Sequence, residues 1–218
     1  MFVWTGTAWV SVATEVESLA TYATQSYADN TPGMKLIVPT SIAVGSGSGS
    51  VSTQGKVSFS SASSVSINGC FSSTYDNYLI LMKAANSIAN QCYMRMRASG
   101  ADNTSSNYLY GGIYVRYGTS SAVAGENSSG LTSNGFNVLD MDGNYGFARI
   151  QVFNPFVSTN ATGVIYDQAF NAGGSSNDGY YEAFSGLTSV NTSYDGCTFY
   201  AATGNMTGDI RIYGLKNG

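Results

Sequence analysis

The sequence contains no histidine, and only 10% of its 218 residues are charged. Without histidine the chain lacks the usual general base and the commonest metal ligand, which counts against an enzyme. Nine Lys and Arg residues stand against thirteen Asp and Glu, for a net charge of -4. The basic residues are scattered, whereas nucleic-acid binding needs many of them together. Neither a nucleic-acid partner nor a cofactor is therefore expected.

Cysteines are also few, and no hydrophobic run is long. Cys70, Cys92 and Cys197 lie far apart in apolar segments, at spacings that fit neither a zinc site nor a redox motif. We expect them to be buried thiols. No apolar run approaches the roughly 18 residues of a membrane helix, so membrane insertion is not expected. The first residues have no basic segment followed by an apolar one, so no signal peptide is expected.

What the chain does contain is apolar and neutral polar residues. Hydrophobic residues make up 43% of the chain and glycine alone contributes 26 residues, which argues against disorder. A low charge has two explanations that stay open here. Partner subunits cover much of the surface, since a bare monomer usually depends on charge for solubility, or the surface is simply a neutral, Ser/Thr-rich β surface.

Residues 1–33 are predicted to form a small unit of their own. Residues 2–4 and 8–10 are β-prone arms around a turn that contains Gly6, which predicts a hairpin. Trp4 and Trp9 need cover from outside the hairpin, because an isolated hairpin buries little. The capping box at Thr14–Glu17 predicts a helix of about 15 residues that ends before Pro32.

The apolar spacing of this predicted helix has two interpretations. Val12, Val16, Leu19, Ala23 and Ser26 follow the 4-3-4-3 spacing of a coiled-coil seam, which predicts a contact between subunits. The alternative is a single amphipathic helix lying on its own β domain, since two heptads are too few to decide.

The rest of the chain is predicted to be mainly β. Residues 34–50 are predicted to be a connector, in which the Gly/Ser tract at 45–50 forms a loop near the domain entrance. Residues 51–218 are predicted to form the β domain. Its candidate strands are residues 57–59, 65–67, 78–82, 92–98, 108–117, 136–139, 147–153, 164–170, 180–184, 197–201 and 210–213. Short strands separated by Gly, Asn, Asp and Ser predict an antiparallel β-sandwich, with a jelly roll as the best single candidate.

Two of these strands have informative patterns. Residues 78–82 are continuously apolar, which predicts a strand covered on both faces. In residues 92–98 the apolar Cys92, Met94, Met96 and Ala98 alternate with Tyr93, Arg95 and Arg97. This alternation predicts that the two sets point to opposite faces of the strand.

No motif for catalysis or for metal binding stands out. Residues 140–144 resemble the start of a calcium loop but lack its later acidic ligands, so a turn that ends a strand is favoured. No pair of acidic residues is marked out by its context for glycoside hydrolysis. A serine hydrolase is not supported either, because the chain has no Gly-X-Ser-X-Gly motif.

The 16 tyrosines are the best candidates for contacts with a ligand. Tyrosine combines a flat apolar ring with a hydroxyl, which suits stacking on sugars. Several lie beside predicted loops, and the loop at 173–179 is the candidate tip. The predicted receptor contacts are Tyr108, Tyr110, Asn177, Asp178, Tyr180 and Tyr181. The alternative is that these tyrosines only fill the sandwich or a subunit interface.

Three sequence blocks together resemble a known family. They are residues 75–81 (YDNYLIL), 93–103 (YMRMRASGADN) and 207–218 (TGDIRIYGLKNG), in that order. The chain resembles, over residues 34–218, the C-terminal β domain of many tailed-phage structural proteins, especially tail-fibre and minor tail proteins. In that family Arg and Asp residues like Arg95, Arg97 and Asp102 recur, and we expect them to hold strand ends or subunit contacts.

The resemblance implies a β-sandwich, trimers and a place in the virion after assembly in the host cytoplasm. We therefore expect a short homotrimeric tail fibre or receptor-binding tip that attaches to a host surface glycan without catalysis. Its N-terminal unit, with Trp4, Trp9, Val16, Leu19 and Ala23, would contact its sister chains or another virion protein of the tail, baseplate or capsid. The alternatives are a capsid head fibre or decoration protein, a capsule-degrading enzyme and a bacterial lectin.

Overall fold

The structure is a computed structural model, and it describes residues 2–11, 33–118, 122–128, 130–141, 143–171 and 178–215. Every regular element within these ranges is a β-strand, and every strand pair is antiparallel. The predicted all-β character is confirmed. The chain divides into two units, one of residues 1–33 with 217–218 and one of residues 34–216.

The first unit contains the predicted hairpin. Strand β1 (Phe2–Trp4) pairs with β2 (Trp9–Ser11), and Trp4 lies directly opposite Trp9. The Thr5 amide donates a hydrogen bond to the Ala8 carbonyl at 2.9 Å and closes the turn. The predicted helix that starts at the capping box Thr14–Glu17, with Val16, Leu19 and Ala23, lies outside the described residues.

The second unit holds the remaining strands. They are β3 (Met34–Leu36), β4 (Ser41–Gly45), β5 (Ser48–Val51), β6 (Val57–Ala62), β7 (Ser64–Asn68), β8 (Asn77–Asn86), β9 (Asn90–Ala98), β10 (Ala101–Asp102), β11 (Tyr108–Tyr117), β12 (Ala122–Asn127), β13 (Phe136–Met141), β14 (Gly146–Phe153), β15 (Gly163–Asn171), β16 (Gly179–Thr188), β17 (Gly196–Ala201) and β18 (Met206–Leu215). All of the candidate strands predicted between residues 57 and 213 are present.

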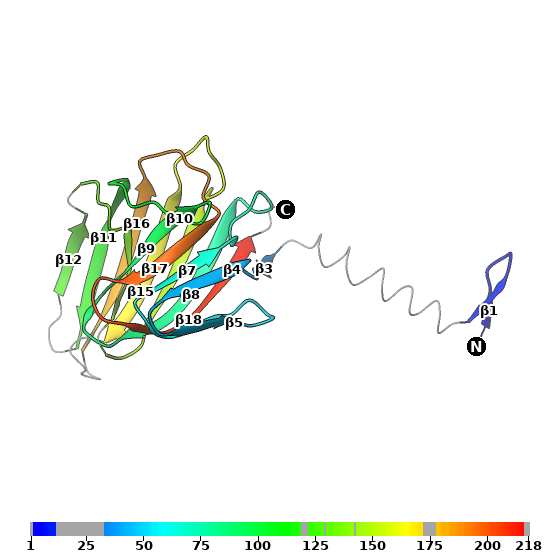
Figure 1. Cartoon of the computed structure of the whole chain (residues 1–218), viewed down its shortest axis with the longest axis horizontal. Helices are drawn as coiled ribbons and strands as arrows, with labels where there is room; N and C mark the ends of the chain where they lie inside the picture. The colour runs from blue at the N-terminus through cyan, green and yellow to red at the C-terminus, as the bar shows by residue number, and fades with distance from the viewer. Residues whose placement is uncertain are drawn as a thin grey trace. The chain divides into compact units, whose positions relative to one another are not determined.

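These strands form two sheets (Figure 1). The large sheet has the order β12-β11-β16-β15-β14-β8-β18-β6-β5, with β3 also on β18. The small sheet has the order β10-β9-β17-β7-β4, with β13 also on β9. From β6 to β9 the chain alternates between the sheets, and it does so again from β16 to β18. This arrangement makes most strand pairs distant in sequence.

One hydrophobic core joins the two sheets, as in a β-sandwich. Tyr78, Ile80 and Met82 of β8 point into this core, and so do Met94 and Met96 of β9. Their period-2 spacing places alternate side chains inside, which confirms the alternation predicted for residues 92–98. The three cysteines are free thiols and are buried in the same unit, as predicted.

The predicted connector at residues 34–50 is wrong, because this segment belongs to the sheets. Strand β4 pairs with β7, and β5 pairs with β6. Between them Ser46 and Gly47 both have positive φ angles, 56° and 61°. Two such residues in succession make a tight turn, so the Gly/Ser tract passes the chain from the small sheet to the large one. The Gly/Ser tract therefore forms a compact turn, although its composition is typical of a flexible linker.

Arg97 fastens the strands of the small sheet to one another. Its guanidinium pairs with Asp102, donates to Thr198 Oγ1 at 2.9 Å and to Ser66 Oγ at 3.1 Å, and is almost fully buried. Thr198 in turn donates to Asp102 at 2.7 Å. These contacts join β7, β9, β10 and β17, which agrees with the structural role predicted for Arg97 and Asp102. Removing one partner of such a network leaves a buried charge uncompensated.

Among the described residues, no helix has the length and apolar character needed to cross a bilayer.

Candidate functional site

The outer face of the large sheet, which points away from the core, carries many apolar side chains. An antiparallel sheet with a solvated face normally shows polar residues there. Here the outward positions include Leu81 of β8, Phe147 of β14, Ile165 of β15 and Leu187 of β16, and all of them are exposed. The continuous apolar run of β8 predicted cover on both faces, yet Leu81 is 39% exposed in the single chain. A surface of this kind marks an interaction site.

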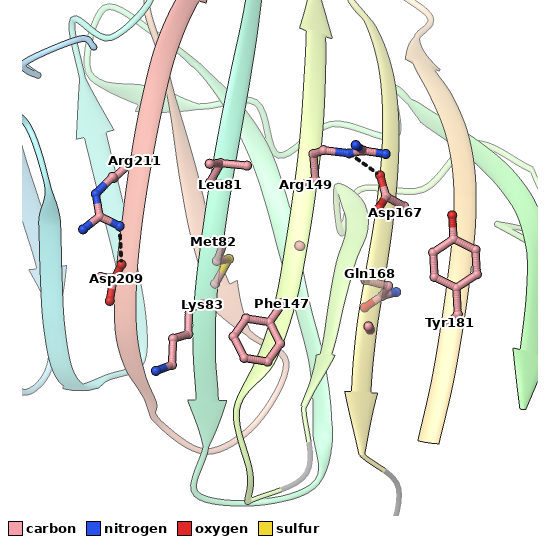
Figure 2. A pocket seen from close by; sticks show the side chains of 12 residues that line it. Leu81, Met82, Lys83, Phe147, Arg149, Asp167, Gln168, Tyr181, Asp209 and Arg211 are labelled. Atoms are coloured by element: carbon pink, nitrogen blue, oxygen red, sulfur yellow. Dashed lines mark hydrogen bonds and ion pairs between the residues drawn. The ribbon is translucent and has the colours of Figure 1, made fainter. Parts of the chain in front are cut away.

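Within this face lies a hollow of about 460 Å³ formed by β8, β14, β15, β16 and β18 (Figure 2). The strand register explains it. Phe147 pairs with Ala169, and Ala169 pairs with Tyr181, so a methyl group lies between two aromatic rings. In Figure 2 the two rings flank β15 on either side. Because Ala169 is small, it leaves an open space between the larger side chains of Phe147 and Tyr181.

Charged side chains border the hollow. Arg149 Nε donates to Asp167 Oδ1 at 2.8 Å across β14 and β15. Arg211 pairs with Asp209 two residues earlier on β18, at 3.2 Å. The Lys83 ammonium lies 4.1 Å from the centre of the Tyr145 ring, a cation–π contact. The hollow therefore combines aromatic walls with several hydrogen-bond donors and acceptors, which is the usual chemistry of a small-ligand site.

Beside the hollow, the outer face of β11, β12, β15 and β16 carries exposed apolar side chains, and Asp167, opposite Ala183, lies at its border with the hollow. We call this the apolar area, and its exposed members are Leu109, Ile113, Val123, Ile165 and Leu187. Ile113 lies opposite Ala183 and Gly125, and Leu109 lies opposite Leu187. Exposure of these apolar side chains to water is unfavourable. The apolar area therefore favours contact with another protein surface.

The predicted receptor contacts do not come together at one place. Tyr108 is fully buried, packs edge-on against Phe136 at 5.1 Å and donates from its hydroxyl to the Asn103 carbonyl at 2.9 Å. This placement removes it from the candidate receptor contacts. Tyr110 is half-buried on the inner face beside Phe184, and burial raises the pKa of its hydroxyl. Asn177 lies outside the described residues.

Asp178 and Tyr180 lie near each other on the inner face, at the start of β16. Asp178 pairs with the Arg116 guanidinium, and this hydrogen-bonded contact raises the pKa of Arg116. The Arg116 guanidinium lies 5.4 Å from the centre of the Tyr180 ring, which stacks on Phe170 at 5.1 Å. Tyr181 points to the opposite face and lines the hollow. Of the predicted contacts, Tyr181 is therefore the one that joins the hollow.

A second group of polar side chains is enclosed on the inner face of the large sheet. Glu182 is 3% exposed, and burial raises its pKa from 4.5 to about 8. Gln168 Nε2 donates to Glu182 Oε2 at 2.6 Å, and Gln168 Oε1 accepts from the Asp140 amide. Burial also raises the pKa of Asp140, to about 6. The buried Tyr166 hydroxyl has no hydrogen-bond partner among the described residues.

In the part of the chain that the structure describes, no three His, Cys, Asp or Glu side chains lie close enough together to hold a metal ion. Asp140 is the second-last residue of β13, and Gly143, between β13 and β14, has a φ of 62°. This geometry fits the turn that the sequence favoured over a calcium loop. Asp142 lies outside the described residues.

Sequence reasoning missed most residues of the hollow, namely Lys83, Phe147, Arg149, Asp167, Asp209 and Arg211. Alternation along each strand gives the face of a residue, so Phe147 and Arg149 could have been assigned to one side. It does not give which strands are neighbours. The hollow depends on β14, β15 and β16 lying in that order beside β8 and β18, and no local pattern contains this information.

Comparison of the chain with models of protein families, with curated proteins and with solved structures gives no match.

Proposed function

We propose that the chain is a structural protein of a tailed-phage virion that forms a short trimeric tail fibre or receptor-binding tip. It attaches to a host surface glycan and performs no catalysis. The observation that carries this proposal is the outer face of the large sheet, where an apolar area lies beside an aromatic-walled hollow. The former suits contact between subunits and the latter suits a ligand. The assignment to a phage virion comes from the three sequence blocks that resemble phage tail proteins.

The fold that best fits the strand order is a jelly roll. Its two four-stranded sheets would be β6-β18-β8-β14 and β7-β17-β9-β13, and all of these neighbours are paired. The chain visits them in the order of two Greek keys, which is the jelly-roll connection. The hairpins β11–β12 and β15–β16 then widen one sheet of this framework. Both the hollow and the apolar area depend on that widening.

Contacts between three copies would use the apolar area, with the N-terminal unit as a second attachment. Trp4 and Trp9 are 52% and 68% exposed, with ring centroids 5.5 Å apart. Two large exposed rings on a small hairpin suit docking on a sister chain or on another virion protein. Three copies side by side multiply a weak glycan contact through avidity.

The charges in the hollow favour binding over hydrolysis. In the hollow, Asp167 and Asp209 are each held by an arginine. A glycosidase needs one protonated acid within reach of the glycosidic bond. The acid with the most strongly raised carboxyl pKa, Glu182, lies on the inner face and not in the hollow. A capsule-degrading enzyme is the weaker candidate for this reason, and incubation with host polysaccharide should release no reducing ends.

Sedimentation equilibrium tests the assembly. The full chain should sediment as a trimer, and Ile113→Asp should shift it towards monomer because a carboxylate in an apolar interface is costly to desolvate. Ser58→Asp, on an outward position of β6 away from the apolar area, is the matched control and should remain trimeric. A full chain that stays monomeric at high concentration would refute the trimer.

Imaging of the particle tests the location. Labelled antibody against the chain should mark the tail tip, and purified protein should compete with particles for adsorption to host cells. The second candidate, a capsid head fibre or decoration protein, uses the same apolar area but predicts label on the capsid. In that case deletion of the gene would leave adsorption unchanged.

A further inference from the structure

The hollow has the spacing needed to hold a flat ring between two aromatic side chains. Phe147 and Tyr181 project from β14 and β16, which are separated by β15. Two strand spacings place their backbones about 10 Å apart. Ala169, between them, offers only a methyl group as the floor. A sugar ring presents an apolar C–H face, which can lie against an aromatic ring at this place.

The charged groups around the hollow present cations more openly than anions. The Arg149 side chain is 60% exposed against 28% for its partner Asp167, and Arg211 is 43% exposed against 31% for Asp209. Lys83 adds a third cation. The border thus carries three positive and two negative groups, although the whole chain has a net charge of -4. The local excess of positive charge favours an anionic ligand.

We propose that the hollow binds an acidic sugar of the hexuronate class. Its ring lies between Phe147 and Tyr181 above Ala169, and its carboxylate takes hydrogen bonds from Arg149. Asp167 holds Arg149 in place and accepts from sugar hydroxyls, whereas Lys83, Arg211 and Asp209 lie beyond Phe147. This inference rests on the proposed function only for the origin of the sugar, a host surface polysaccharide. The binding chemistry itself does not depend on the virion.

Calorimetric titration of the full chain tests the proposal with two probes. One is a hexuronate trisaccharide and the other is a neutral hexose trisaccharide of the same linkage. The acidic probe should bind at least about tenfold more tightly at low ionic strength, and the preference should shrink as added salt screens the charges. Equal affinity for both probes would overturn the assignment of an acidic sugar.

Three variants locate the binding. Ala169→Leu fills the floor between the rings and should reduce affinity for the acidic probe at least about tenfold. Arg149→Met keeps the apolar stem but removes the charge, so it should lose the preference for the acidic probe. Gln151→Ala is the matched control, because Gln151 points outward from the same strand but does not line the hollow. It should bind as the unaltered chain does.

The amide spectrum of each variant shows whether it is folded. Unchanged binding in a folded Ala169→Leu would place the sugar elsewhere and overturn the proposal. Absence of binding in the assembled, unaltered chain would also overturn the proposal. Particle imaging separates the two claims. A chain found at the tail tip that binds no acidic sugar keeps the proposed function and loses this inference.

Discussion

At the scale of single residues, the unusual feature is an acid kept inside the sandwich. Glu182 lies between β15 and β11 on the inner face, and burial raises its pKa to about 8. At neutral pH it is therefore largely protonated, and its carboxyl group acts as a neutral hydrogen-bonding group towards Gln168. Asp140 nearby shifts in the same direction. The folded chain holds protons that the unfolded chain releases.

This predicts a definite pH dependence of stability. Between pH 4.5 and about 8 the folded state binds more protons at Glu182 than the unfolded state does, so the free energy of unfolding falls as pH rises through this window. Glu182→Gln keeps the acceptor and removes the titration. The variant should be more stable above pH 8 by on the order of 2–5 kcal/mol, and this gain should shrink towards pH 4.5.

Urea unfolding at pH 5, 7 and 9 measures this effect. Asp209→Asn, on the outer face, serves as the control and should keep the slope of the unaltered chain. If Glu182→Gln and the unaltered chain lose stability with pH in parallel, Glu182 is ionised in the folded protein.

At the scale of elements, the β4–β5 turn decides how the chain enters the sandwich. Gly47 has a φ of 61°, and a Cβ there would lie 2.1 Å from the Ser60 carbonyl oxygen. Ser46 Oγ holds the same turn by donating to the Ser61 carbonyl at 3.1 Å. The atoms that block a Cβ at position 47 belong to the backbone of Ser60 and Ser61, which cannot move aside as a side chain could. The turn therefore requires glycine at position 47.

Gly47→Ala and Gly100→Ala form a matched pair that tests this requirement. Gly100 also has a positive φ, 80°, but a Cβ there meets nothing within 4 Å. We expect Gly100→Ala to cost about 1–2 kcal/mol of stability, from backbone strain alone. Gly47→Ala should cost at least about 1 kcal/mol more, because the clash pushes the β4–β5 turn away from the backbone of β6. Equal losses in urea unfolding would show that the turn adapts.

The same elements show what a sequence can and cannot predict. Residues 92–98 were predicted correctly because period-2 alternation depends only on the geometry of one strand. Residues 34–50 were not, because Gly and Ser support a tight turn and a loose linker equally well. Tyr108 follows a polar run and was expected near the surface, yet it shares the inward side of β11 with Tyr110. The hollow requires the order of strands, which arises only on folding.

At the scale of the whole molecule, the described strands of both sheets lie between residues 34 and 215. A fragment that begins at Met34 should therefore fold on its own and unfold in a cooperative thermal transition. Its self-association should weaken at least about tenfold, because the proposed trimer also uses the N-terminal unit. Sedimentation equilibrium over a range of concentrations measures this constant. An unchanged constant would assign assembly to the β domain alone.

The two aromatic walls of the hollow have different origins in the chain. Phe147 belongs to β14, a strand of the proposed eight-stranded framework, whereas Tyr181 belongs to the hairpin β15–β16 that extends it. A change confined to the hairpin would remodel one wall and leave the framework's pairing intact. The molecule thus separates the part that must fold from the part that can diversify, and a new ligand preference at the hollow would need only a new hairpin.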